Sequence, residues 1–131
     1  MRFSVKKARI AQELLSKRVI CEDSLPRVIK YVGGVDVAYC EGFSIGAVAV
    51  LDFNSLELIE SQAVCCKTRF PYVPTLLSFR EVSPAVQAIK KLRTQPDIFL
   101  VDGQGIAHPR RFGFASHLGL VIDKPTIGVA K

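Results

Sequence analysis

The stretch Ile98-Phe99-Leu100-Val101-Asp102-Gly103 decides the fold. Four apolar residues follow one another without a break, which is typical of a strand that is covered on both faces. They lead directly into an acid and a glycine. Residues 126–130 form a second apolar run, which we expect to be another buried strand, and Pro109 can open a short helix between the two runs, through Leu118. This order predicts a strand–helix–strand unit of an α/β sheet.

The preceding part of the chain predicts three more strands. Runs of β-branched and apolar residues, bounded by turn residues, indicate strands over 31–38, 44–53 and 56–67. Because the links between them are short, we expect an antiparallel meander. Joined to the strand–helix–strand unit, the meander predicts a mixed α/β sheet with helices on its faces.

Two further helices are expected around these strands. Residues 5–18 carry apolar side chains at helical spacing, and a second helix should begin near Ser83, with Ser83 as its cap and Pro84 in its first turn. The apolar stripe of the first helix consists of Ala8, Ala11, Leu14 and Leu15.

Composition limits the class of protein. The 131 residues fit one domain, 49% are hydrophobic, and the formal net charge of +6 favours a polyanionic partner. No apolar run is long enough for a membrane helix, and the first residues lack the apolar stretch of a secretory signal. We therefore expect a cytoplasmic protein that contacts no membrane.

The cysteines and histidines do not have the spacing of a zinc site. Cys21, Cys40 and the adjacent Cys65-Cys66 form no CxxC pair, so we expect buried, reduced thiols. His108 and His117 are nine residues apart and do not share a helical face.

Three acidic residues indicate a different metal site. Asp36 interrupts an apolar strand, where an ionised carboxylate is costly unless it is paired or binds a metal. Asp102 ends another strand, at the sheet edge where ligands collect in α/β proteins, and Glu81 follows a proline-rich loop. Carboxylates facing each other from two strands suit Mg²⁺, with Mn²⁺ as the alternative. The structural alternative is that Asp102 caps a loop and Asp36 pairs with an internal Arg or Lys.

Two loops carry features of nucleic-acid binding. Gly103 and Gly105 allow the backbone to approach a base or a phosphate, and His108 and Arg110 add donors and positive charge on the same loop. The alternative is a glycine-rich turn with solvated arginines. In Pro71-Tyr72-Val73-Pro74 the prolines stiffen the backbone around an aromatic ring, which could enter a base stack or pack beneath the loop.

Together these segments closely resemble the endonuclease V family. The resemblance implies a ribonuclease-H-like fold, with residues 1–131 as the N-terminal and central part of the catalytic domain. It also implies metal-dependent cleavage at the second phosphodiester 3′ to hypoxanthine, in inosine-containing DNA or, as the alternative, RNA. The matching stretches are 32–38, 69–74 with 77–81, 102–119 and 125–131.

The resemblance also implies residue roles. Asp36 and Asp102 are similar to the family's metal-binding carboxylates, Glu81 to the third acid of that site, and Lys131 to the lysine near the scissile phosphate. Tyr72, between Pro71 and Pro74, would be the tip of a wedge that fills the base stack when the damaged base is extruded. The base pocket and its rim would include Gly103, Gly105 and His108.

Family members continue past the lysine strand through another helix, whereas this sequence stops at Lys131. We therefore expect a C-terminally incomplete fold and weak cleavage by the 131-residue form. A nucleic-acid-binding protein without turnover and a nuclease for branched DNA are the rival hypotheses. The choices of DNA or RNA and of Mg²⁺ or Mn²⁺, and the oligomeric state, stay open.

Overall fold

A computed structural model describes residues 4–21, 25–68 and 77–130. Three helices and five strands lie in these ranges, in the regions where the sequence predicts them. None of the described helices is long and apolar enough to cross a membrane. In chain order the elements are α1 (Val5–Ser16), β1 (Tyr31–Cys40), β2 (Phe43–Asp52), β3 (Leu58–Lys67), α2 (Leu77–Lys90), β4 (Ile98–Asp102), α3 (Phe114–Ile122) and β5 (Thr126–Val129).

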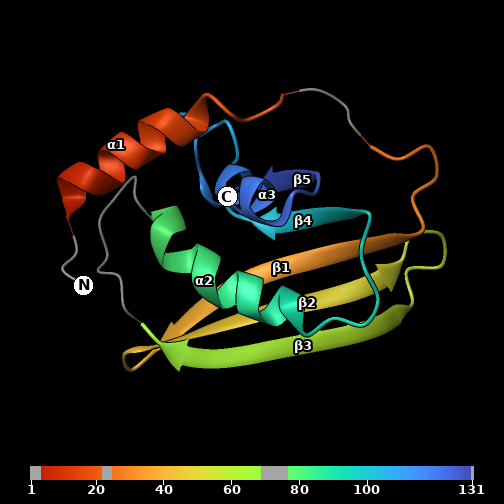
Figure 1. Cartoon of the computed structure of the whole chain (residues 1–131). Helices are drawn as coiled ribbons and strands as arrows, with labels where there is room; N and C mark the ends of the chain where they lie inside the picture. The colour runs from red at the N-terminus through yellow and green to blue at the C-terminus, as the bar shows by residue number, and fades with distance from the viewer. Residues whose placement is uncertain (1–3, 22–24, 69–76, 131) are drawn as a thin grey trace.

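The five strands form one mixed sheet in the order β3-β2-β1-β4-β5 (Figure 1). β1, β2 and β3 pair antiparallel, whereas β4 pairs parallel with both β1 and β5. The turn between β1 and β2 is tight because Glu41 and Gly42 both adopt positive φ, of 47° and 84°. The predicted meander and the predicted mixed α/β sheet are confirmed.

The hydrophobic core lies between one face of this sheet and helices α2 and α3. Side chains alternate along a strand, so Val35 and Val37 of β1 and Val48 and Val50 of β2 all turn toward the helices. In α2, Ala85, Ala88 and Ile89 meet them at the predicted helical spacing, and Leu92, just after the end of the helix, joins the same core.

The other face of the sheet remains open over β4 and β5. Leu100 is 43% exposed, and Ile127 and Val129 are also exposed, because α2 and α3 pack on the opposite face. The expectation that these two strands are buried on both faces is therefore wrong. An unbroken apolar run does not reveal how many faces of its strand are covered.

Helix α2 begins earlier than predicted. Its first residue is Leu77, so Ser83 is not a cap, and Pro84 lies inside the helix. Pro84 cannot donate a backbone hydrogen bond to the Arg80 carbonyl. The helix nevertheless continues because it packs closely on β2, where a Cβ on Gly46 would lie 2.2 Å from the Pro84 carbonyl oxygen. The packing of α2 on β2 here outweighs the preference of Pro84 for the first turn of a helix.

The other two helices also differ from their predictions. α3 begins at Phe114 after its N-cap Gly113, whereas the segment after Pro109 forms turns. In α1, the buried residues are Ala8 and Gln12, while Leu14 of the predicted apolar stripe is 60% exposed.

The expectation of buried thiols is wrong. Cys21, Cys40 and Cys65 are exposed and Cys66 is half-buried, and all four are free. Side chains alternate along a strand, and Tyr39 and Cys66 lie on the face of the sheet that meets α2. Their neighbours Cys40 and Cys65 therefore lie on the opposite face.

Candidate active site

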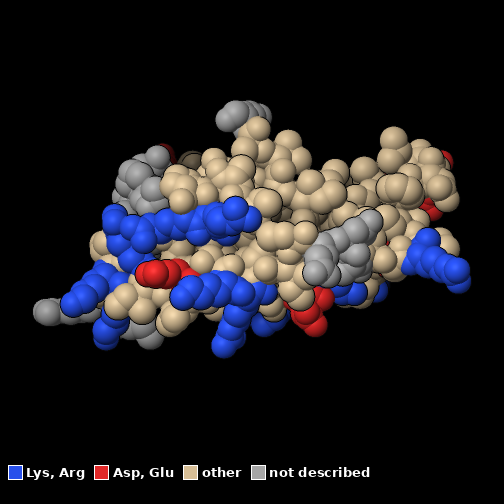
Figure 2. Space-filling view, turned by 90° about the horizontal axis from the view of Figure 1, so that it is seen from above, with Lys and Arg blue, Asp and Glu red and all other residues tan. Residues whose placement is uncertain are grey.

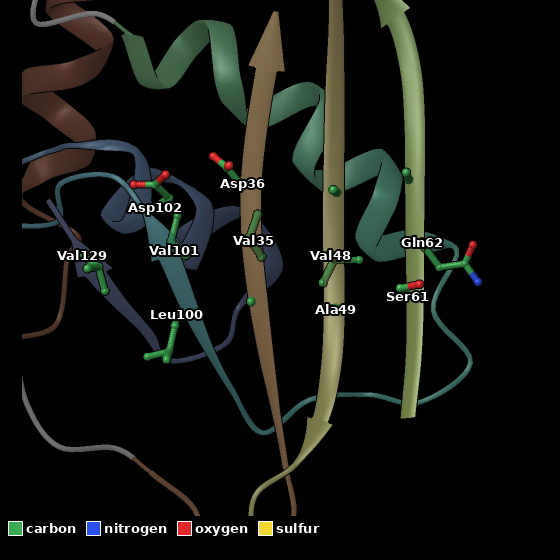
Figure 3. A pocket seen from close by; sticks show the side chains of 13 residues that line it. Val35, Asp36, Val48, Ala49, Ser61, Gln62, Leu100, Val101, Asp102 and Val129 are labelled. Carbon is green, nitrogen blue, oxygen red and sulfur yellow. The ribbon is translucent and has the colours of Figure 1, made fainter. Parts of the chain in front are cut away.

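Asp36 and Asp102 lie side by side on the open face of the sheet. Val35 of β1 pairs in parallel with Val101 of β4, so the two acids are the next residues along neighbouring strands, which run about 4.8 Å apart. Figure 3 shows the two side chains at a similar level of the sheet, Asp102 at the C-terminal end of β4 and Asp36 midway along β1. Both acids are exposed, so the expected burial of Asp36 in an apolar strand is wrong, since alternation turns it away from the core. Its Oδ1 accepts a hydrogen bond from the Val37 N–H at 2.8 Å.

A shallow apolar hollow continues from the two acids across the same face (Figure 3). Its floor is made largely of small or short side chains, and among the residues that the structure describes only Asp36 and Asp102 line it with a charge. The hollow is the uncovered sheet surface, and we assign the chemistry to the carboxylates at its border. Its lining includes Gly34, Ala47, Ala49 and Ala63.

Glu81 lies close enough to the two aspartates to respond to their charges. It is the fifth residue of α2, and its side chain is half-buried. Burial raises the pKa of Glu81 to about 7, and the charges of Asp36 and Asp102 raise it further in that order, whereas Arg80 acts in the opposite direction. Helix and strands therefore bring together the three predicted acids.

The residues present fit a hard divalent cation. Three carboxylates supply only oxygen atoms, which Mg²⁺ and Mn²⁺ prefer. After the larger effect of burial, the charges of Asp36 and Asp102 raise the pKa of Glu81, and a cation would offset these charges. In the part of the chain that the structure describes, no three His, Cys, Asp or Glu side chains are grouped tightly enough to hold an ion as they stand. A bound cation would therefore have to draw the three acids closer.

The glycine-rich loop after β4 packs against the end of β5. A Cβ on Gly128 would lie 2.6 Å from both the Gly103 carbonyl oxygen and the Gly105 nitrogen, so only glycine permits this approach. The loop is braced from within. The Gly113 N–H donates to the Gly105 carbonyl at 3.0 Å, and the Arg110 N–H donates to His108 Nδ1 at 3.0 Å.

Residues of this loop differ in their accessibility. His108 is buried, while the side chain of Arg110 is exposed. The predicted wedge residues Pro71, Tyr72 and Pro74, and the predicted phosphate-binding Lys131, lie outside the described residues.

Comparisons with known proteins bear on this arrangement. A family model described as Endonuclease V matches residues 13–131. The curated Endonuclease V of Rippkaea orientalis is 53% identical over 130 residues, which cover 98% of this chain and 56% of that protein. That of Thermofilum pendens is 48% identical over 129 residues, with the same two shares.

The chain belongs to the endonuclease V family.

Solved endonuclease V structures have the same fold. The Streptomyces avermitilis enzyme superposes with a TM-score of 0.92 at 41% identity, covering 99% of this chain and 58% of that one. The Ciona intestinalis enzyme, in complex with a 24-mer DNA containing an inosine followed by a ribo-adenosine, gives 0.88 at 34% identity, with shares of 97% and 57%. The chain thus spans a little over half the length of the endonuclease V relatives it matches.

Residues that the sequence analysis missed surround Glu81. The Arg80 guanidinium lies 3.9 Å from the centre of the Tyr39 ring, and the Ser78 hydroxyl lies 3.2 Å from Nδ1 of His117. His117 also contacts Phe79 and burial lowers its pKa to about 4, so its ring is neutral at pH 7. Arg80 and His117 lie in stretches that match the family, but no role in the site was assigned to either of them from the sequence. No sequence signal linked Tyr39 to the site, because it approaches α2 from β1.

Proposed function

We propose that this chain is the N-terminal and central part of a metal-dependent endonuclease. It would cleave inosine-containing nucleic acid at the second phosphodiester 3′ to hypoxanthine. The observation that carries the proposal is the placement of Asp36 and Asp102 on adjacent parallel strands, with Glu81 near enough to respond to both charges. Membership of the endonuclease V family supports the substrate, and so does the inosine-containing DNA bound to the Ciona intestinalis relative.

The three acids divide the chemistry between them. Asp36 and Asp102 would bind Mg²⁺ or Mn²⁺ through exposed carboxylates. The bound cation supplies positive charge that activates water and offsets charge on the phosphodiester. Glu81 has a pKa of about 7, because burial and the two aspartates disfavour its ionised form, so it can take up a proton near neutral pH. Lys131 would offset charge developing on the scissile phosphate.

The remaining residues would bind and orient the strand. Gly103 and Gly105 present backbone close to the end of β5, where a flipped base could contact peptide groups, and His108 braces the rim of this loop. Tyr72, held between Pro71 and Pro74, would fill the gap left in the base stack. We assign phosphate contacts to the exposed Arg110.

Positive charge on the surface supports a nucleic-acid partner. Figure 2 looks onto the side of the molecule that carries α1, and Lys and Arg side chains spread widely over it. Five basic residues of α1 and its C-terminal end are exposed, against one acid, Glu13. A phosphate backbone would be attracted to such a surface at low salt. The basic residues are Lys6, Lys7, Arg9, Lys17 and Arg18.

The test compares matched strands that contain inosine or adenine, as DNA and as RNA, with Mg²⁺, with Mn²⁺ and with EDTA. We expect weak but metal-dependent cleavage of the inosine strand by the 131-residue form, lost in Asp36→Asn and Asp102→Asn. Asp123→Asn is the matched control, because Asp123 is an exposed acid at the end of α3 with a φ of 53°, which asparagine also tolerates. Tight, metal-independent binding of the inosine strand without cleavage would instead support a binding protein.

A further inference from the structure

The start of α2 is held by side chains from two directions. On one side, the Arg80 guanidinium stacks on the Tyr39 ring at 3.9 Å from its centre. On the other, Ser78 lies within hydrogen-bond distance of His117, and the Phe79 ring meets His117 edge-on at 4.9 Å. Since Glu81 follows these three residues directly, its position depends on both sets of contacts.

Side-chain contacts matter here because the backbone is weakened. Pro84 has no N–H to donate to the Arg80 carbonyl, so the helix lacks one hydrogen bond at the turn that carries Glu81. The Tyr39–Arg80 stack lies at this same turn. It joins the helix to β1, the strand that also carries Asp36.

Tyr39 does not act mainly as a core residue. Its side chain is 38% exposed, and it lies three residues after Asp36, on the face of β1 that meets α2. The Tyr39 ring is less buried than the side chains of Val35 and Val37. It nevertheless contacts Arg80, the residue that directly precedes Glu81.

We infer that Tyr39, through its stack with Arg80, is a positioning residue that holds Glu81 toward Asp36 and Asp102. This inference rests on the proposed function, because it assumes that the three acids bind one divalent cation. The stack ties the helix and the strand that carry two of these acids, so it reduces the freedom of Glu81 relative to Asp36. Residues that orient metal ligands change metal affinity when they are replaced, although they do not contact the ion.

The test measures Mn²⁺ affinity from the free-ion electron paramagnetic resonance signal, with the whole chain and without nucleic acid. Tyr39→Leu removes the ring and should weaken Mn²⁺ binding about tenfold or more. Tyr39→Phe keeps the ring face and should bind Mn²⁺ like the parent. Tyr31→Leu is the matched control, because Tyr31 also lies on β1 beside a cation, Lys30 at 5.3 Å, but at the end far from the acids.

Each outcome bears on a different statement. Equal Mn²⁺ affinity in the parent and Tyr39→Leu overturns the inference, and so does an equal loss in Tyr31→Leu. A parent that binds Mn²⁺ but does not distinguish inosine from adenine strands contradicts the proposed specificity alone. A parent that binds no Mn²⁺ overturns both statements.

A second variant covers the case in which Tyr39→Leu does not fold, as judged by circular dichroism. Arg80→Lys keeps the positive charge but loses the planar group that stacks on the ring. It should weaken Mn²⁺ binding more than Tyr39→Phe does. Parent-like affinity in Arg80→Lys would overturn the inference.

Discussion

Replacing Glu81 by Gln should stabilise the metal-free chain at alkaline pH. Burial first, and then the charges of Asp36 and Asp102, raise the pKa of this carboxyl from 4.5 to about 7. Folding therefore favours the protonated form, and the parent loses stability as the pH rises from about 4.5 through 7. Gln resembles the protonated acid and cannot ionise, so the free energy of unfolding of the variant should not fall in this pH range.

The size of the effect follows from the shift in pKa. One pKa unit corresponds to about 1.4 kcal/mol, so raising the pKa from 4.5 to about 7 corresponds to at most about 3.5 kcal/mol. Glu81 is only partly buried, and solvent screens part of its interaction with the aspartates, which reduces the expected gain to about 1–2 kcal/mol. At pH 4.5 and below the gain should disappear.

Urea unfolding in EDTA, repeated between pH 4 and pH 8.5, measures this difference. Glu60→Gln is the control, because the pKa of Glu60 is lowered by folding whereas that of Glu81 is raised. Hydrogen bonds from Gln62, Thr94 and Arg93 lower the pKa of Glu60, so its ionised form stabilises the fold, and the parent's advantage over this variant should vanish as the pH falls. If the free energies of unfolding of the parent and Glu81→Gln run parallel across this pH range, Glu81 does not respond to the two aspartates and the site geometry is wrong.

Three further predictions concern the loops and the charged surface. Gly128→Ala should lower the free energy of unfolding by about 1–3 kcal/mol, because its Cβ would overlap the Gly103 carbonyl; an unchanged melting temperature would contradict this packing. Tyr72→Ala should weaken binding of inosine strands by about 1–3 kcal/mol if stacking dominates, while Mn²⁺ affinity stays constant, and equal strand binding would remove Tyr72 from the wedge role. Strand affinity should fall steeply with salt, and Arg110→Gln should reduce the slope of log affinity against log salt by about 1, so a slope equal to the parent's would mean that Arg110 contacts no phosphate.

The elements and the acids could be predicted because their signals are local. Apolar and β-branched runs located all five strands, and Asp102 was found because it directly follows such a run. The start of α2 could not be predicted in this way. Pro84 is a helix-starting residue by local preference, and only the close approach of α2 to Gly46 explains why the helix encloses it.

The site was predictable as a set of residues but not as an arrangement. Asp36 looked unusual because it interrupts valines, yet strand alternation turns it outward, to the face that also carries Asp102. The contacts of Tyr39 and His117 could not be predicted, because their partners Arg80 and Ser78 are about 40 residues away in the chain.

By itself, the sequence determined the number and type of the elements, the identity of the three acids and the family to which they point. Each of these depends on the order of residues along the chain. Only the tertiary structure decided that β1 and β4 place Asp36 beside Asp102 with Glu81 of α2 nearby, that burial and the two aspartates raise the pKa of Glu81, and that one face of β4 and β5 is exposed. The physical reason is that strand register, desolvation and charge repulsion depend on distances between segments that are far apart in sequence, and no local pattern encodes those distances.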